Sequence, residues 1–109
     1  MTPPVPAANC ATPGVQISYP SNGTVVGGSV NISGTASIPE FQFYKVEYAP
    51  AGTNNFASIG TTVPSPVNGG HLMTWNAGGF PSGVWALRLT VVDMTGNFPP
   101  PCTIHVVIP

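Results

Sequence analysis

Hydrophobic and polar residues alternate with a period of two in short blocks along most of the chain. Such alternation puts apolar side chains on one face of a β-strand and polar side chains on the other. Glycine, proline and asparagine fall between the blocks, where turns are expected. No segment combines the period of a helix with capping residues. The pattern therefore predicts an all-β sandwich.

Seven strands are expected from these blocks. They lie at residues 15–19, 29–36, 41–50, 56–60, 71–77, 83–93 and 102–108. The segment PSPVNGG, which precedes the fifth strand, is expected to be a loop, because proline and glycine rarely occupy the interior of a strand ladder. The number and spacing of the strands are typical of a single sandwich domain.

The third block, FQFYKVEYAP, has aromatic side chains in both phases of the alternation. Phe41 and Phe43 share one phase, whereas Tyr44, Val46 and Tyr48 share the other, so a flat strand cannot bury all five on one side. We expect a bend or bulge near Phe43 that turns the second set toward the core.

Lys45 and Glu47 then face outward, on the side away from the core. Glu47 is expected to lie across from Arg88 of a neighbouring strand as a surface ion pair worth at most about 1 kcal/mol if it is exposed. The alternative is that Lys45 belongs to a covalent-bond or ligand site. The outward phase of Lys45 favours a solvated side chain.

Charged residues make up only 5% of the chain, the net charge is -1, and Lys45 and Arg88 are the only strong bases. Nucleic acid is excluded as a partner because phosphate binding needs clustered cations. No apolar run of membrane-spanning length exists, so membrane insertion is not expected. The low charge also suits a surface that packs against copies of itself, with the apolar last strand as a pairing edge.

Cys10 and Cys102 lie near opposite ends of the chain and lack the spacing of a zinc site. One disulfide formed in an oxidising compartment is expected, and two free buried cysteines are the alternative. The opening TPPVPAA is typical of a stiff proline-rich linker. Residues 1–9 are therefore expected to be a linker remnant and residues 10–109 the domain, with Met1 starting a piece of a longer precursor.

Catalysis needs titratable groups that converge, and the chain has few of them. His71 and His105 fall on different strands and Asp93 is the only aspartate, so no enzyme activity and no cofactor are expected. Asp93 and Asn97 flank a turn and form a weak candidate for calcium. One carboxylate is too few for tight binding, so Asp93 is expected to bond the backbone of its own turn.

Surface aromatics are the remaining candidates for binding. Phe41 and Phe43 are candidate ligand-facing rings for a sugar, a peptide or a neighbouring domain, and their burial under a connection is the alternative. Phe80 and Phe98 precede prolines and are expected to staple loops against the ends of the sandwich. Trp75 and Trp85 are large enough that core packing is expected for both.

Four segments together resemble a known family. They are YPSNGTVVGGSVNISGTA, FQFYKVEYAP, LMTWNAGGFPSGVWALRLTVVDMTGN and PPPC. From Cys10 onward the chain resembles bacterial immunoglobulin-like modules, similar to fibronectin type III domains, of secreted and cell-surface proteins. Cys10 and Cys102 match a cysteine pair in part of this family, which supports the disulfide. Trp85 stands where many of these modules have a tyrosine, so a tyrosine-corner hydrogen bond would need an indole N–H as donor.

The resemblance implies a seven-stranded antiparallel Greek-key sandwich located outside the cell or on its surface. It also implies a non-catalytic spacer or adhesion unit whose partners are neighbouring domains of the same polypeptide. The alternatives are a module that binds carbohydrate such as cell-wall glycan and a self-assembling surface subunit. Some bacterial surface sandwiches that this chain resembles also carry an isopeptide bond between a lysine and an asparagine, which Lys45 with Glu47 as the assisting acid would suggest here.

Overall fold

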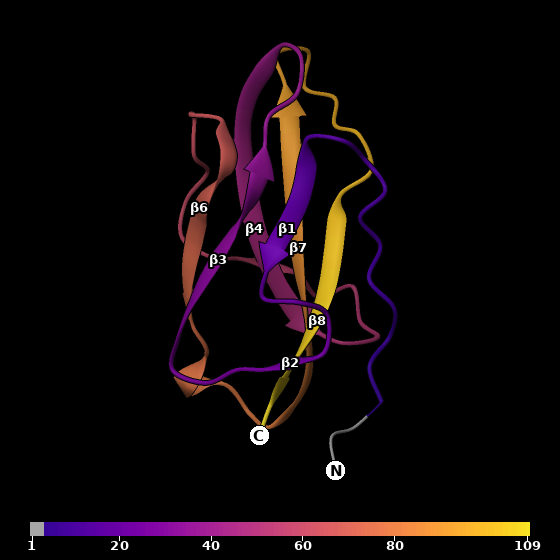
Figure 1. The fold of residues 1–109 in the computed structure, drawn as a ribbon, viewed down its shortest axis with the longest axis vertical. Helices are drawn as coiled ribbons and strands as arrows, with labels where there is room; N and C mark the ends of the chain where they lie inside the picture. The colour runs from indigo at the N-terminus through magenta and orange to yellow at the C-terminus, as the bar shows by residue number, and fades with distance from the viewer. Residues whose placement is uncertain (1–3) are drawn as a thin grey trace.

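Two β-sheets pack face to face in the computed structural model, which describes residues 4–109 (Figure 1). The three-stranded sheet has the order β1 (Val15–Tyr19), β3 (Ser29–Ala36) and β6 (Val67–Asn76). The five-stranded sheet has the order β2 (Thr24–Val25), β8 (Cys102–Ile108), β7 (Gly83–Asp93), β4 (Phe41–Pro50) and β5 (Ala57–Ser58). A short 3₁₀ helix, η1 (Ala77–Gly79), follows β6. The predicted all-β sandwich is confirmed.

The core lies between the two sheets and is built from the inward phase of each strand. Its largest fully buried side chains include Ile32, Tyr44, Val46, Leu87 and Leu89. Tyr44 also carries a polar atom into the core, where its hydroxyl donates a 2.6 Å hydrogen bond to the Leu72 carbonyl of the opposite sheet. Burial raises the pKa of the Tyr44 phenol, because the phenolate would lose its hydration.

β4 contains the irregularity that its sequence predicted. The register against β7 shifts between Phe41 and Phe43, as a bulge does. Tyr44 and Val46 are buried, and Tyr48 is half-buried against the core. The predicted inward set is therefore confirmed.

Strand number and bounds differ from the expectation in three places. β2 is an additional strand of two residues that pairs in parallel with β8. β5 covers only Ala57–Ser58 of the expected 56–60. β6 begins at Val67, so the expected loop PSPVNGG is wrong in its second half. Glycines fit there because β6 pairs with β3 on one side only and its register shifts at two points.

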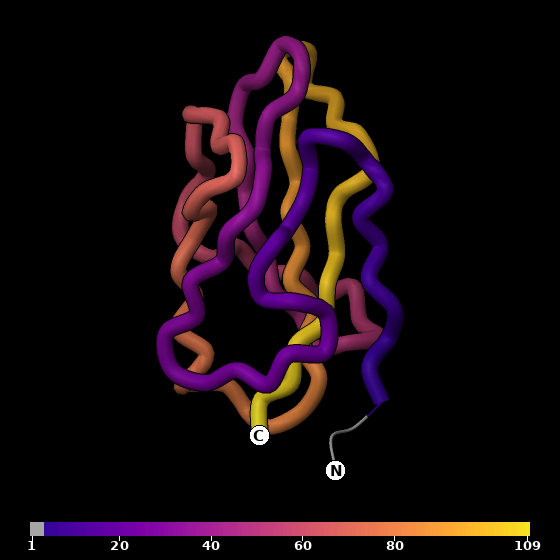
Figure 2. Tube along the Cα trace, viewed as in Figure 1, coloured from indigo at the N-terminus to yellow at the C-terminus, as the bar shows by residue number. Residues whose placement is uncertain are grey.

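The segment from Pro4 to Cys10, here called the strap, runs beside β8 (Figure 2). Asn9 and Thr103 exchange two backbone hydrogen bonds of 2.9 and 3.0 Å in an antiparallel bridge. Cys10 and Cys102 form the predicted disulfide, which is thereby confirmed. Residues 4–9 of the expected linker therefore lie against the sandwich, and residues 1–3 lie outside the described part of the chain.

The outer edge of β8 is covered along its length. The backbone of Thr103 is hydrogen-bonded to Asn9 of the strap. Further along β8, the His105 carbonyl accepts from the Gly23 amide at 2.7 Å. The Val107 carbonyl accepts from the Val26 amide at 2.9 Å. The expectation that the last strand is an open pairing edge is wrong, because the chain supplies its own partners there.

The molecule is elongated, with principal extents of 43 × 24 × 23 Å. The strap begins and β8 ends at the same end of the long axis (Figure 1). Among the described residues, no helix has the length and apolar character needed to cross a membrane.

Candidate functional site

The outer face of the five-stranded sheet gathers both strong bases of the chain. Since Tyr44 and Val46 point into the core, the alternation along β4 sends Lys45 and Glu47 to the opposite face. The register pairs Glu47 with Arg88 of β7 directly across the ladder.

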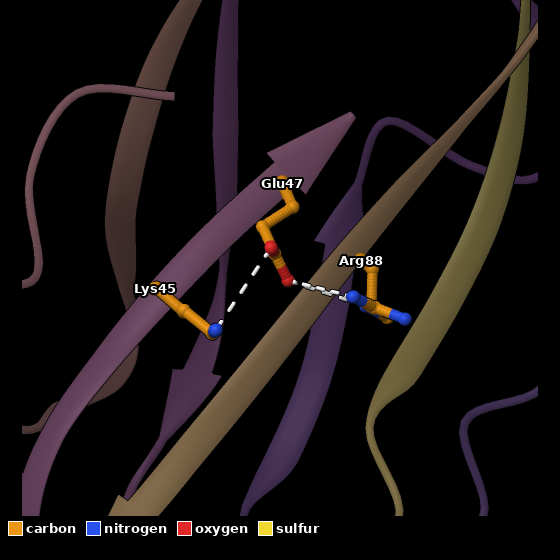
Figure 3. A network of polar contacts seen from close by, with 3 residues as sticks. All are labelled: Lys45, Glu47 and Arg88. Carbon is orange, nitrogen blue, oxygen red and sulfur yellow. Dashed lines mark hydrogen bonds and ion pairs between the residues drawn. The ribbon is translucent and has the colours of Figure 1, made fainter. Parts of the chain in front are cut away.

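Glu47 is the centre of a three-residue charge network (Figure 3). Its Oε1 accepts hydrogen bonds from Arg88 Nη2 at 2.9 Å and Nε at 3.3 Å, and its Oε2 lies 3.8 Å from Lys45 Nζ. The structure thus places Arg88 where the sequence predicted it. The expected surface character does not hold for Glu47, which is only 7% exposed.

Phe56 covers one face of the Arg88 side chain. Its ring lies against the Arg88 guanidinium, with 3.7 Å between the guanidinium carbon and the ring centroid. This is a cation–π contact. The sequence analysis did not assign Phe56 a role, although its position at the start of the fourth predicted block placed it one strand away from Glu47.

A pocket of about 140 Å³ opens beside the network. Its lining residues are Lys45, Glu47, Arg88, Thr90, Val92, Phe98 and Pro101. We call it the charged pocket. Phe98 is 57% exposed, so the expectation that it staples a loop against an end of the sandwich is wrong. The prolines after Phe98 lead the chain back over the sheet, where the ring lines the charged pocket.

The two candidate ligand-facing rings on β4 are both half-buried. Phe41 packs against the core cluster. Phe43 shares the outward phase of Lys45 and pairs in register with Val92, a lining residue of the charged pocket. A ligand role for Phe41 and Phe43 stays a prediction.

Four aromatic rings pack together between the sheets. Tyr48, Trp75, Phe80 and Trp85 contact one another with centroid distances of 4.8 to 6.5 Å. Trp85 Nε1 donates a 3.0 Å hydrogen bond to the Pro81 carbonyl, so an indole here makes a bond of the tyrosine-corner kind. The buried Trp75 Nε1 has no hydrogen-bond partner among the described residues.

Asp93 serves the turn that follows β7. Its Oδ1 accepts hydrogen bonds from the Thr95 hydroxyl at 2.6 Å, the Thr95 amide at 2.9 Å and the Asn97 amide at 3.1 Å. The Thr95 hydroxyl makes the largest contribution to lowering the pKa of Asp93 below its ordinary value. The Asn97 side chain turns to the Thr95 hydroxyl at 3.1 Å instead of joining the carboxylate. In the candidate calcium site, Asp93 Oδ1 thus accepts hydrogen bonds from its own turn, as the alternative interpretation expected.

The two histidines belong to different sheets. His71 is exposed on β6, and His105 is nearly buried on β8, with its amide donating to Asn22 Oδ1 at 2.7 Å. Burial lowers the pKa of His105 because the imidazolium would lose hydration. Within residues 4–109, no three His, Cys, Asp or Glu side chains gather in a set that could hold a metal ion.

Comparison with known proteins places these features in a family. The sequence pattern of the bacterial Ig domain family matches residues 13–88, which include β1 to β6 and the first part of β7. No curated protein and no solved structure matches the chain. The match, the two-sheet sandwich and its strand order agree, and the chain therefore belongs to the bacterial Ig domain family.

Proposed function

We propose that this chain is a non-catalytic structural module of a larger secreted or cell-surface protein. In this side-mounted arrangement the domain projects from the rest of the polypeptide and does not lie in line with it. The observation that carries the proposal is the strap. It runs antiparallel to β8, so the described chain begins and ends at the same end of the long axis (Figure 1).

A module that separates its neighbours along a line has its two ends at opposite poles. In this domain the path enters and leaves at one pole, so the sandwich stands away from the polypeptide that carries it. The far pole, which includes the turn between β3 and β4, is then the part presented to the surroundings.

The polar groups support a structural role rather than a chemical one. Glu47 and Arg88 bind each other, Asp93 binds its own turn, and His105 lies beside Asn22. The Cys10–Cys102 disulfide supports a location in an oxidising compartment. Neighbouring domains are the proposed partners, and binding of cell-wall glycan and self-association stay predictions.

Distance measurement between spin labels tests the side-mounted arrangement. We expect labels at Pro4 and Pro109 to give a short distance, well below the 43 Å length of the molecule. Labels at Ser37, on the turn between β3 and β4, and Pro109 serve as the matched control and give a distance close to that length. A 4-to-109 distance as long as the control would reject the side-mounted arrangement.

A further inference from the structure

We propose that the charged pocket binds the carboxylate group of a small ligand. In this site Lys45 and Thr90 contact the carboxylate, and Phe98 and Pro101 contact the apolar part of the ligand. The proposal does not depend on the side-mounted arrangement, because every lining residue comes from β4, β7 or the connection between β7 and β8.

Charge is the first argument. The chain has a net charge of -1 and two strong bases, and both bases line this one pocket. Glu47 is the only acid among the lining residues, so the pocket carries one net positive charge. Asp93 uses its carboxylate within its own turn. A negative ligand is therefore favoured here over a neutral or positive one.

Hydrogen-bond donors are the second argument. Glu47 Oε1 takes the Nε and Nη2 donors of Arg88 and fixes that side chain. Lys45 Nζ lies 3.8 Å from Glu47 Oε2, which is too long for a hydrogen bond, so within residues 4–109 the ammonium has an ion-pair partner but no acceptor. Lys45 can thus donate to a ligand without breaking the pair between Glu47 and Arg88.

Thr90 adds a polar group to the floor of the pocket. The residue is 4% exposed and lines the pocket, and its hydroxyl makes no side-chain hydrogen bond to the described part of the chain. The Thr90 hydroxyl is not a fully buried unsatisfied group, because Trp75 Nε1 is the one such side-chain atom among the described residues. It is therefore open to the pocket, where it can hydrogen-bond a ligand oxygen. Thr90 pairs with Lys45 across the ladder, so both groups can reach one carboxylate.

Size and wall chemistry define the rest of the ligand. A volume of about 140 Å³ is close to the roughly 150 Å³ of a cavity that holds benzene. Val92, Phe98 and Pro101 supply apolar walls, and Phe98 stands exposed at the rim. The pocket fits a carboxylate that carries a short aliphatic group better than it fits an inorganic anion.

Titration of the protein with sodium propionate tests the proposal by ¹H–¹⁵N NMR at constant ionic strength. We expect saturable shifts at the amides around Lys45, Thr90 and Phe98, with a dissociation constant in the millimolar range. Propionamide has the same shape without the charge, and we expect it to bind at least fivefold more weakly. Equal binding of the two probes, or propionate shifts that rise linearly without saturation, would overturn the proposal.

Three variants locate the site. Lys45→Met and Thr90→Val are each expected to weaken propionate binding at least fivefold, whereas His71→Gln, on the other sheet, leaves it unchanged. Dispersed amide spectra check that each variant is folded, and Lys45→Gln replaces Lys45→Met if the latter does not fold. Unchanged affinity in both Thr90→Val and the folded Lys45 variant would show that propionate binds elsewhere and would overturn the proposal.

Discussion

Arg88 makes two kinds of contact at once. The edge of its guanidinium donates to Glu47, and its face lies on the Phe56 ring. Arginine suits both contacts because its planar group presents donors in its plane and a weakly hydrated face. Glu47 depends on this arrangement, since a nearly buried carboxylate without a hydrogen-bonded partner is strongly disfavoured.

Replacing Arg88 tests this dependence. We expect Arg88→Met to lower the free energy of unfolding by about 3 kcal/mol, because Glu47 stays buried without its partner. Urea denaturation followed by tryptophan fluorescence measures the change. Lys45→Met is the matched control, and since Lys45 is partly exposed and 3.8 Å from Glu47, its effect should stay below about 1 kcal/mol. Equal losses in the two variants would contradict the dependence.

We expect His105 to make the free energy of unfolding depend on pH. Burial lowers its pKa below the ordinary value of 6.5, so the unfolded chain takes up a proton at a higher pH than the folded domain does. Stability should therefore be complete above about pH 7 and fall as the pH drops through 6.5 and below.

Urea midpoints at pH 7.5 and pH 5 measure this effect. We expect the midpoint to fall between these two values in the natural chain and to change less in His105→Gln. His71→Gln is the matched control, because it removes an exposed histidine of the other sheet. Asp93 has a lowered pKa, so its contribution is lost only as the pH falls below about 3.8, outside the tested interval. Identical dependence in both histidine variants would contradict the assignment to His105.

At the scale of elements, the close approach of β1 and β3 depends on Gly34, which has no side chain. A Cβ atom at Gly34 would collide with the backbone carbonyl of Gln16 on β1. Gly34 lies in the middle of the pairing between the two strands. β1 can thus lie this close to β3 only if residue 34 is glycine.

Gly34→Ala should therefore weaken the three-stranded sheet. We expect a loss of about 1 to 3 kcal/mol in the free energy of unfolding, since the strands must separate to admit the methyl group. Gly27→Ala is the control, because a Cβ there would meet no atom within 4 Å. Thermal denaturation by circular dichroism compares the two, and a smaller shift for Gly34→Ala than for Gly27→Ala would show that the collision is not limiting.

Alternation along the chain predicted the long strands of the five-stranded sheet. β4, β7 and β8 were placed correctly, and the phase of β4 was enough to set Glu47 opposite Arg88. β2 has two residues, too few to show a period. The glycine-rich start of β6 resembles a loop because edge pairing needs no side-chain pattern.

The strap and the charged pocket could not be predicted for a different reason. The opening of the strap has the composition of a linker, and its attachment depends on Asn22 and the edge of β8, which are distant in sequence. Phe56 reaches the Arg88 guanidinium, and Phe98 reaches the pocket, by the paths of two loops. Periodicity describes which side of a strand faces inward, but it says nothing of what a loop later covers.

At the scale of the whole molecule, the strap and β8 form a clasp that closes the sandwich at one long edge. Asn22 links the two, because its Nδ2 donates to the Pro6 carbonyl at 2.9 Å while its Oδ1 accepts from the His105 amide. The disulfide closes the clasp where the strap ends, at Cys10, and β8 begins, at Cys102. Residues 11–101 all lie within the loop that this bond closes.

This clasp decides how the domain would carry a pulling force. With the disulfide formed, the shortest covalent path between Pro4 and Pro109 runs through Cys10 and Cys102 and bypasses residues 11–101. At about 3.4 Å per residue, that path extends to about 50 Å, whereas the reduced chain reaches about 350 Å. We expect single-molecule stretching from the two ends to give the short length for the oxidised protein and the long one with a reductant or in Cys10→Ala/Cys102→Ala.

A full-length extension of the oxidised protein would contradict this path. If the path is correct, pulling separates the strap and then β8 from the strands beside them. The extension then stops at the disulfide, and the strands enclosed by this bond carry no force. This bacterial Ig domain would then keep most of its strands paired while a pulling force acts on the two ends of its chain.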